Sequence, residues 1–378
     1  SGAKVLVKAK SNISLAASKS LTSTTGPIVL WGRAASLESS SDQGFLSMDN
    51  GSSLSTSGGD VYIAGSTSTD GSGFPNGHLF TNDSTNKYAI AMGSSSSGSA
   101  MSITTSGGAI RMYGQTGSAA SQAFAIQSAS TTTINAGSGR IDVNAVSASI
   151  NDNAFEAWNG GVTFSSSAPA DAVNNVPAIK WVSNITNSAS TYNPVQVPNV
   201  AMTWQATGGG DIDFTATSAN TGVYAFDQTK SIQLLASTGR IRLNTGVNGL
   251  DLTNTGAGTV TFGALSAGTS SSDIVLTGDR FNEATANASA AGISVRTSGA
   301  VTIQPYSQSF SSSQTFDSTW AFPGVSGVNG GYNASVTIGQ SGTGGTISGA
   351  TQNNSDVTLS TALTSAGPIS IYGKSVTA

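Results

Sequence analysis

Residues 231–268 read SIQLLASTGRIRLNTGVNGLDLTNTGAGTVTFGALSAG and contain the pattern that decides the fold. Apolar residues occur there in short alternating pairs, and turns rich in Gly, Asn, Ser and Thr separate the pairs. The pairs are Ile232 and Leu234, Ile241 and Leu243, Leu250 and Leu252, and Val260 and Phe262. Alternation with a period of two over so few residues predicts short β-strands that bury one face.

The same unit recurs along the chain as a Gly, one intervening residue, and two apolar residues two positions apart. Its glycines are Gly26, Gly59, Gly108, Gly139, Gly160, Gly210, Gly239, Gly258, Gly299 and Gly367. A short unit repeated in this way is typical of a solenoid, in which stacked units bury each other's apolar faces. Glycine suits the corners of such a stack because it tolerates a positive φ.

The spacing of the repeats predicts the coil length and the loops. Gly239 and Gly258 are 19 residues apart, a distance that fits one coil of two or three strands. Other spacings are longer, so the excess is expected to leave the stack as insertions at 65–100, 165–206 and 304–332, where prolines interrupt strand pairing. The sequence therefore predicts one all-β domain, residues 1–378, folded as a right-handed parallel β-helix (a β-solenoid) with loop insertions.

The composition excludes several classes of protein. Charged residues make up 9% of the chain, against about 25% in typical proteins, and 15 Lys and Arg face 19 Asp and Glu without a basic run. A nucleic-acid-binding protein needs a positive surface along the phosphates, so nucleic acid is not an expected partner. No apolar run is long enough to span a membrane, and the absence of Cys excludes thiol chemistry and disulfides.

Several copies of the unit resemble the repeats of filamentous-haemagglutinin-type exoproteins, which are bacterial adhesin passengers secreted by two-partner or autotransporter routes. The copies are 237–245 (STGRIRLNT), 256–265 (GAGTVTFGAL), and 12–17 (NISLAA) followed by 24–28 (TTGPI). The resemblance implies a right-handed parallel β-helix, a secreted location at the bacterial cell surface or outside the cell, and a role in adhesion or surface structure.

Charged residues on the predicted outer face allow two interpretations. Asp211 and Asp213 are two positions apart and share a face, so they are candidates for an acid pair or a Ca²⁺ site. We favour ordinary solvated positions. A ladder of ion pairs with Arg111, Arg140, Arg240 and Arg242, each pair worth ~0–1 kcal/mol, is left open as an alternative. The single histidine, His78, follows a turn signal and is expected in an exposed loop. The sequence thus predicts no catalytic residue, no metal site and no cofactor.

Aromatic residues are crowded into two regions that overlap the predicted insertions. The candidates for stacking on sugar rings or on a protein partner are Trp158, Trp181, Tyr192, Trp204, Tyr306, Trp320 and Tyr332. Burial is the commoner fate of aromatic side chains, so the alternative is that each insertion has a small core of its own against the helix.

These observations favour a structural or adhesive segment of a secreted bacterial cell-surface protein. Its expected partners are copies of itself, in a fibre or a surface layer, or host and cell-surface glycans and proteins. Two alternatives stay open. A carbohydrate-active β-helix enzyme, a polysaccharide lyase or hydrolase, needs acidic and basic residues that converge in a groove. A phage fibre domain needs an outward apolar face repeated on successive coils.

Overall fold

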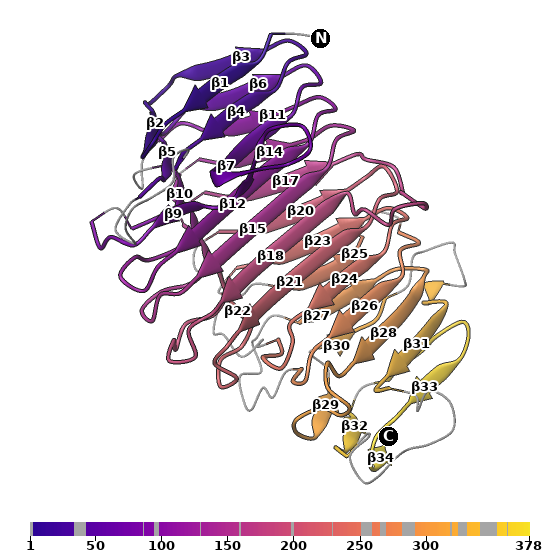
Figure 1. The fold of residues 1–378 in the computed structure, drawn as a ribbon. Coiled ribbons are helices and arrows are strands. Elements are labelled where there is room, and N and C mark those ends of the chain that lie inside the picture. The colour runs from indigo at the N-terminus through magenta and orange to yellow at the C-terminus, as the bar shows by residue number, and fades with distance from the viewer. Residues whose placement is uncertain are drawn as a thin grey trace.

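The computed structural model is a stack of short parallel strands that runs from one end of the chain to the other (Figure 1). It describes residues 3–33, 43–85, 87–93, 98–128, 130–158, 160–197, 200–228, 230–250, 259–264, 270–281, 292–317, 320–323, 331–340, 354–360 and 362–378. These residues form strands and connecting segments without an α-helix, and so without a helix that could cross a membrane. The prediction of an all-β parallel β-helix is confirmed.

Three long sheets, here named A, B and C, form the sides of the stack. Sheet A follows the path β1 (Val5–Lys8), β4 (Ile28–Trp31), β7 (Val61–Thr69), β12 (Ile110–Thr116), β15 (Ile141–Ser147), β18 (Ile179–Ile185), β21 (Ile212–Ser218), β24 (Ile241–Asn244), β26 (Ile274–Thr277), β28 (Ala300–Gln304), β31 (Ser335–Ile338) and β33 (Ile369–Ile371). Sheet B contains β2 (Ile13–Leu15), β5 (Leu46–Met48), β10 (Ile90–Met92), β13 (Phe124–Ile126), β16 (Phe155–Ala157), β19 (Val195–Val197) and β22 (Phe226–Gln228). Sheet C contains β3 (Ser20–Ser23), β6 (Ser53–Thr56), β11 (Ser102–Thr104), β14 (Thr132–Asn135), β17 (Val162–Ser166), β20 (Met202–Ala206), β23 (Ile232–Ala236), β25 (Val260–Gly263), β27 (Ile293–Arg296) and β30 (Trp320–Ala321). A small sheet of β29 (Gln314–Phe316), β32 (Val357–Leu359) and β34 (Val376–Thr377) lies near the C-terminal end (Figure 1).

Each regular coil passes once through sheets A, B and C and then returns to sheet A beside its own first strand. Ile212 of β21 pairs with Ile241 of β24, so this coil takes 29 residues. The expected coil of 19 residues from Gly239 to Gly258 is therefore wrong. Gly239 precedes a strand of sheet A, whereas β25, the next described strand along the chain, belongs to sheet C. Gly258 itself lies outside the described residues.

One continuous core fills the stack because the inward side chains are superimposed coil upon coil. The clearest row in sheet A is Ile110, Ile141, Ile179, Ile212, Ile241 and Ile274, each at most 1% exposed. A strand that buries every second residue places the residues between them on the outer face. The alternation read from the sequence therefore decides which side chains are available for function.

Aromatic rings fill the middle of this core. The rings belong to Phe124, Phe155, Phe164, Trp181, Trp204, Phe214 and Phe226, with contacting centroids 4.9 to 6.3 Å apart. Trp181 and Trp204 are completely buried and lie nearly perpendicular to each other. The two tryptophans belong to the shared core of the helix, and not to a separate core of a loop.

Most of the corner glycines are required by close stacking of one coil on the next. A Cβ on Gly239 would lie 2.1 Å from the carbonyl oxygen of Gly210, and a Cβ on Gly139 would lie 2.0 Å from that of Gly108. The expectation that these glycines supply a positive φ is wrong, because the described motif glycines do not have one. In three corners the residue before the motif glycine has the positive φ instead, namely Gly58, Gly107 and Gly209. The other described motif glycines are Gly26, Gly59, Gly299 and Gly367, which precede strands of sheet A, and Gly160, which precedes a strand of sheet C.

The predicted insertion at 65–100 contains a hairpin that covers sheet A. The end of β7 pairs antiparallel with β8 (Pro75–Gly77), and β9 (Leu79–Thr81) then pairs with β12. The hairpin places Phe74 on Tyr62, with ring centroids 4.7 Å apart, and Trp31 donates its indole N–H to the carbonyl of Ser66 at 2.7 Å. This segment therefore buries a small apolar patch on the otherwise polar outer face.

The predicted insertion at 165–206 is mostly regular coil. It contains β18, β19 and β20, each paired in its own sheet. Among its described residues, the segment 167–177, which contains Pro169 and Pro177, leaves the stack. The prediction overestimated this insertion because a proline in a corner was taken as a departure from the helix. The region 304–332 contains β29 and β30, but 318–319 and 324–330 lie outside the described residues.

Candidate ligand-binding groove beside a charged column

A column of charged side chains follows the outer face of sheet A. Its members pair in register from β12 to β24: Arg111, Asp142, Lys180, Asp213 and Arg242. The sign of the charge alternates at every step. Opposite charges on neighbouring strands contribute roughly 0.2–1 kcal/mol per pair and like charges oppose pairing, so the column favours this register over a shifted one.

The strongest pair in the column is Arg242 with Asp213. The guanidinium donates Nη2–H to Asp213 Oδ2 at 2.8 Å and Nε–H to Asp213 Oδ1 at 2.5 Å. These hydrogen bonds, which Arg242 donates to Asp213, raise the pKa of Arg242. Asp211 adds a further contact to the same guanidinium at 3.1 Å. The ion pairs left open as an alternative to solvated positions are therefore present between these arginines and aspartates.

At the corner before sheet A, aspartate carboxylates also hydrogen-bond to the backbone of the next coil. The sequence analysis did not predict these contacts. The carboxylate of Asp60 accepts the backbone N–H of Ala109 at 2.7 Å, and that of Asp211 accepts the N–H of Arg240 at 2.8 Å. Asp273 makes the same contact with the next coil, to Ala300, at 2.9 Å. Each Asp and its backbone partner are about one coil apart in the sequence. With the correct coil length, this spacing identifies the contact.

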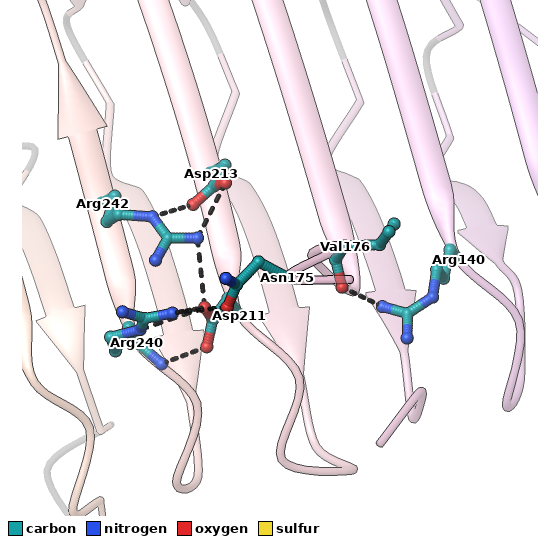
Figure 2. A network of polar contacts seen from close by, with 7 residues as sticks. All are labelled: Arg140, Asn175, Val176, Asp211, Asp213, Arg240 and Arg242. Carbon is teal, nitrogen blue, oxygen red and sulfur yellow. Dashed lines mark hydrogen bonds and ion pairs between the residues drawn. The ribbon is translucent and has the colours of Figure 1, made fainter. Parts of the chain in front are cut away.

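A groove of about 390 Å³ lies between this corner and the loop 167–177. The loop contributes Asp171, Asn175 and Val176 to the groove, and the corner contributes Asp211 and Arg240. The loop folds over the next coil because Pro169 forms a bridge with Gly209. Figure 2 shows Asn175 beside Asp211 and Arg240 on one side and Arg140 reaching Val176 on the other.

Arginines of two coils hold the loop in place. Arg140 donates to the carbonyl of Val176 and lies 3.6 Å from Asp171, while Arg240 donates to Asn175 at 3.5 Å. Asp171 accepts the backbone N–H of Asn174 at 2.9 Å, which lowers its pKa, with Arg140 contributing further. The loop is thus anchored from both directions along the stack.

The polar side chains of the groove are already paired with one another. Asp211 accepts from the backbone and side chain of Arg240 and contacts Arg242, so three donors already satisfy its carboxylate. The Arg240 side chain is 47% exposed and offers donors to a ligand, and Val173, 88% exposed, adds an apolar surface on the loop.

The candidate aromatic residues do not come together in one site. Trp181, Trp204 and Trp320 are at most 2% exposed and cannot stack on a sugar, which corrects their prediction as binding residues. The remaining four are between 36% and 55% exposed, and they follow or precede different strands in different coils: Trp158, Tyr192, Tyr306 and Tyr332. The alternation of apolar positions in β18 and β20 was the signal that these tryptophans point inward.

His78 differs from its prediction as an exposed loop residue. It is half-buried against Tyr113, with ring centroids 5.8 Å apart, and its Nε2 is buried without a hydrogen bond. Burial lowers the pKa of His78. Among the described residues, no three His, Asp or Glu side chains lie close enough together to hold a metal ion.

Comparison of the chain with protein-family models, with curated proteins and with solved structures finds no match.

Proposed function

We propose that this chain is a structural and adhesive segment of a secreted bacterial cell-surface protein, in which a rigid β-helix presents the groove at loop 167–177. The observation that carries the proposal is the unbroken register of sheet A, whose path holds 12 strands over one shared core. At about 4.8 Å per strand, this path forms a rod on the order of 55 Å long. The resemblance of the repeats to filamentous-haemagglutinin-type exoproteins supports the secreted, bacterial setting.

The groove fits a polar ligand such as a cell-surface glycan. Arg240 and Asn175 offer donors and an acceptor, as sugar hydroxyls require. Asp211 fixes Arg240, and Arg240 in turn donates to Asn175, before a ligand arrives. Ligand sites combine a few convergent polar groups with apolar surface, which Ala170, Ala172 and Val176 supply in the groove. The outer column from Arg111 to Arg242 is charged, whereas the alternative of a phage fibre domain needs a repeated apolar face.

The test is a glycan array probed with the purified chain and with two matched arginine variants. Arg240→Ala removes a lining residue of the groove, whereas Arg242→Ala removes a neighbour that contacts the same Asp211 but does not line the groove. We expect glycans that bind the wild type to lose at least about tenfold in affinity with Arg240→Ala and to bind Arg242→Ala nearly unchanged. Equal binding by all three proteins would exclude the groove as the binding site, and turnover of a bound glycan would instead support an enzyme.

End-to-end association of copies is part of the proposal. The strands β1 and β33 end the path of sheet A, and the free edge of a strand is a surface that a strand of another copy can extend. Electron microscopy and sedimentation of the purified chain over a range of concentrations test this association. Filaments with a repeat near the length of one rod would support it, and a monomer at every concentration would exclude it.

A further inference from the structure

The loop that forms one wall of the groove contains a compact turn, residues 171–175. The carboxylate of Asp171 accepts the backbone N–H of Asn174 at 2.9 Å, and its carbonyl accepts the N–H of Asn175 at 2.9 Å. Asn175 ends the turn with a φ of +52°, a left-handed conformation that asparagine adopts more readily than most residues. The turn therefore keeps its own shape, but these contacts do not fix its position relative to Arg240 on the other wall.

One side chain of the preceding coil contacts this loop on both sides of the turn. Arg140, at the corner before β15, donates Nη1–H to the carbonyl of Val176 and Nη2–H to the carbonyl of Pro169 at 3.5 Å. Its Nη2 also lies 3.6 Å from the Asp171 carboxylate, at the start of the turn. A guanidinium is planar and presents five N–H donors in a fixed fork, so it holds several acceptors in one geometry. Arg140 therefore places the turn as a unit.

The contact across the groove is weaker. Arg240 donates to Oδ1 of Asn175 at 3.5 Å, which is longer than the about 2.7–3.2 Å of most N–H···O hydrogen bonds. The same guanidinium is already bound to Asp211, through Nε at 3.1 Å and Nη2 at 3.0 Å. Figure 2 shows the two arginines on opposite sides of the turn, with Arg140 reaching Val176 and Arg240 beside Asn175. Loss of the long contact to Arg240 would therefore leave the contacts to Arg140 intact.

We propose that Arg140 is the positioning residue of the groove: it fixes the turn 171–175 and so sets the distance between Asn175 and Arg240, where the ligand enters. Arg140 is not among the residues that line the groove, so it acts through the turn and not by touching the ligand. The inference rests on the proposed function for the nature of the ligand, whereas the width of the groove is measurable without one. A turn that holds its position for only a fraction of the time reduces the apparent affinity by that fraction.

The first experiment measures the width of the groove between two spin labels by electron paramagnetic resonance. The chain contains no Cys, so Val173→Cys on the loop and Thr238→Cys on the opposite wall accept the labels without a background. We expect one narrow distance distribution in this doubly labelled chain. Addition of Arg140→Ala should broaden the distribution and displace it by more than about 2 Å, the scale of loop rearrangements. The control Arg111→Ala, which removes an ion pair with Asp70 in another segment, should leave it unchanged.

Two further measurements separate positioning from a general loss of structure. Arg140→Lys keeps the positive charge but replaces the fork by a single ammonium, so its distance distribution should be displaced as well. The urea midpoint of Arg140→Ala should stay close to that of the wild type, because the side chain lies outside the core. On the same glycan array, Arg140→Ala should bind the glycans of the wild type at least about tenfold more weakly, and Arg111→Ala should bind them with unchanged affinity.

The outcomes distinguish this inference from the proposed function. An unchanged distance distribution in Arg140→Ala would overturn the positioning role, whatever the array shows. A wild-type distribution in Arg140→Lys would overturn the part assigned to the fork, and a displaced turn with undiminished glycan binding would overturn the link between the turn and the ligand. If the wild type binds no glycan, the proposed function fails, and the groove width alone decides the role of Arg140.

Discussion

The replacement Gly239→Ala tests the close stacking of corners on which the fold depends. The added Cβ would lie 2.1 Å from the carbonyl oxygen of Gly210, 2.5 Å from its carbon and 2.8 Å from the carbonyl oxygen of Gly209. All three atoms belong to the backbone, so no flexible side chain can move aside. Carbon and oxygen atoms normally keep more than about 3 Å apart, and the two coils must therefore separate by about 1 Å at this corner.

The magnitude follows from the hydrogen bonds at the same corner. The N–H of Arg240 donates to Asp211 at 2.8 Å, and the N–H of Ile212 donates to the carbonyl of Arg240 at 2.8 Å. A separation of about 1 Å stretches both beyond hydrogen-bonding distance, at ~1 kcal/mol each. Overpacking adds ~1–3 kcal/mol, and the reduced freedom of alanine in the unfolded chain returns ~0.4–1 kcal/mol. We expect Gly239→Ala to lower the free energy of unfolding by about 3 kcal/mol.

Gly161→Ala is the matched control. Gly161 also lies in a corner and does not have a positive φ, but the nearest atom to its Cβ would be the carbonyl oxygen of Ala201 at 3.7 Å. Urea unfolding followed by circular dichroism gives the global effect, and amide exchange of β21 and β24 gives the local one. Wild-type stability in Gly239→Ala, or an equal loss in the control, would refute the role assigned to the corner contact.

Three further perturbations examine the core, the histidine and the charged column. Ile241→Asp places a charge without a partner at a completely buried position, so we expect several neighbouring coils to unfold. An unchanged melting curve would contradict the inward position of this side chain. Burial lowers the pKa of His78, so its contribution to stability is present above its unfolded value of 6.5 and is lost as the pH falls through the lower folded value. His78→Gln should remove this acid-dependent loss in urea titrations between about pH 5 and 7, and an identical pH dependence would exclude the histidine as its cause. Asp213→Lys places a third positive charge between Lys180 and Arg242. The free energy of unfolding should fall by about 1 kcal/mol at low salt and by less at high salt, and urea midpoints at two salt concentrations measure the difference. A loss that salt does not diminish would argue against a charge effect.

The sequence was sufficient for the architecture because period-two alternation reports burial directly. Ile241 and Leu243 are buried as the alternation predicts, and Arg242 between them is on the outer face. The coil length was not predictable from the motif alone, because the same Gly-containing corner precedes strands of sheet A and of sheet C. The spacing of two such glycines is therefore not by itself the length of a coil.

The groove was harder to predict because it is built across coils. Arg240 meets Asn175 across 65 residues, and this pair follows no local pattern. The clustering of tryptophans was a stronger signal in the composition, but it led to the wrong location, since Trp181 and Trp204 are completely buried in the core. Burial of a large aromatic side chain outweighs any benefit of exposing it, unless a partner is present.

The alternating column on sheet A has a consequence for how such a chain can change in length. Deletion of the single coil that carries Lys180 would bring Asp142 beside Asp213, two like charges on adjacent strands. Deletion of two consecutive coils would instead bring Arg111 beside Asp213 and keep unlike charges adjacent. Tandem duplication or loss of genetic segments in this stretch is therefore best tolerated in even multiples of one turn.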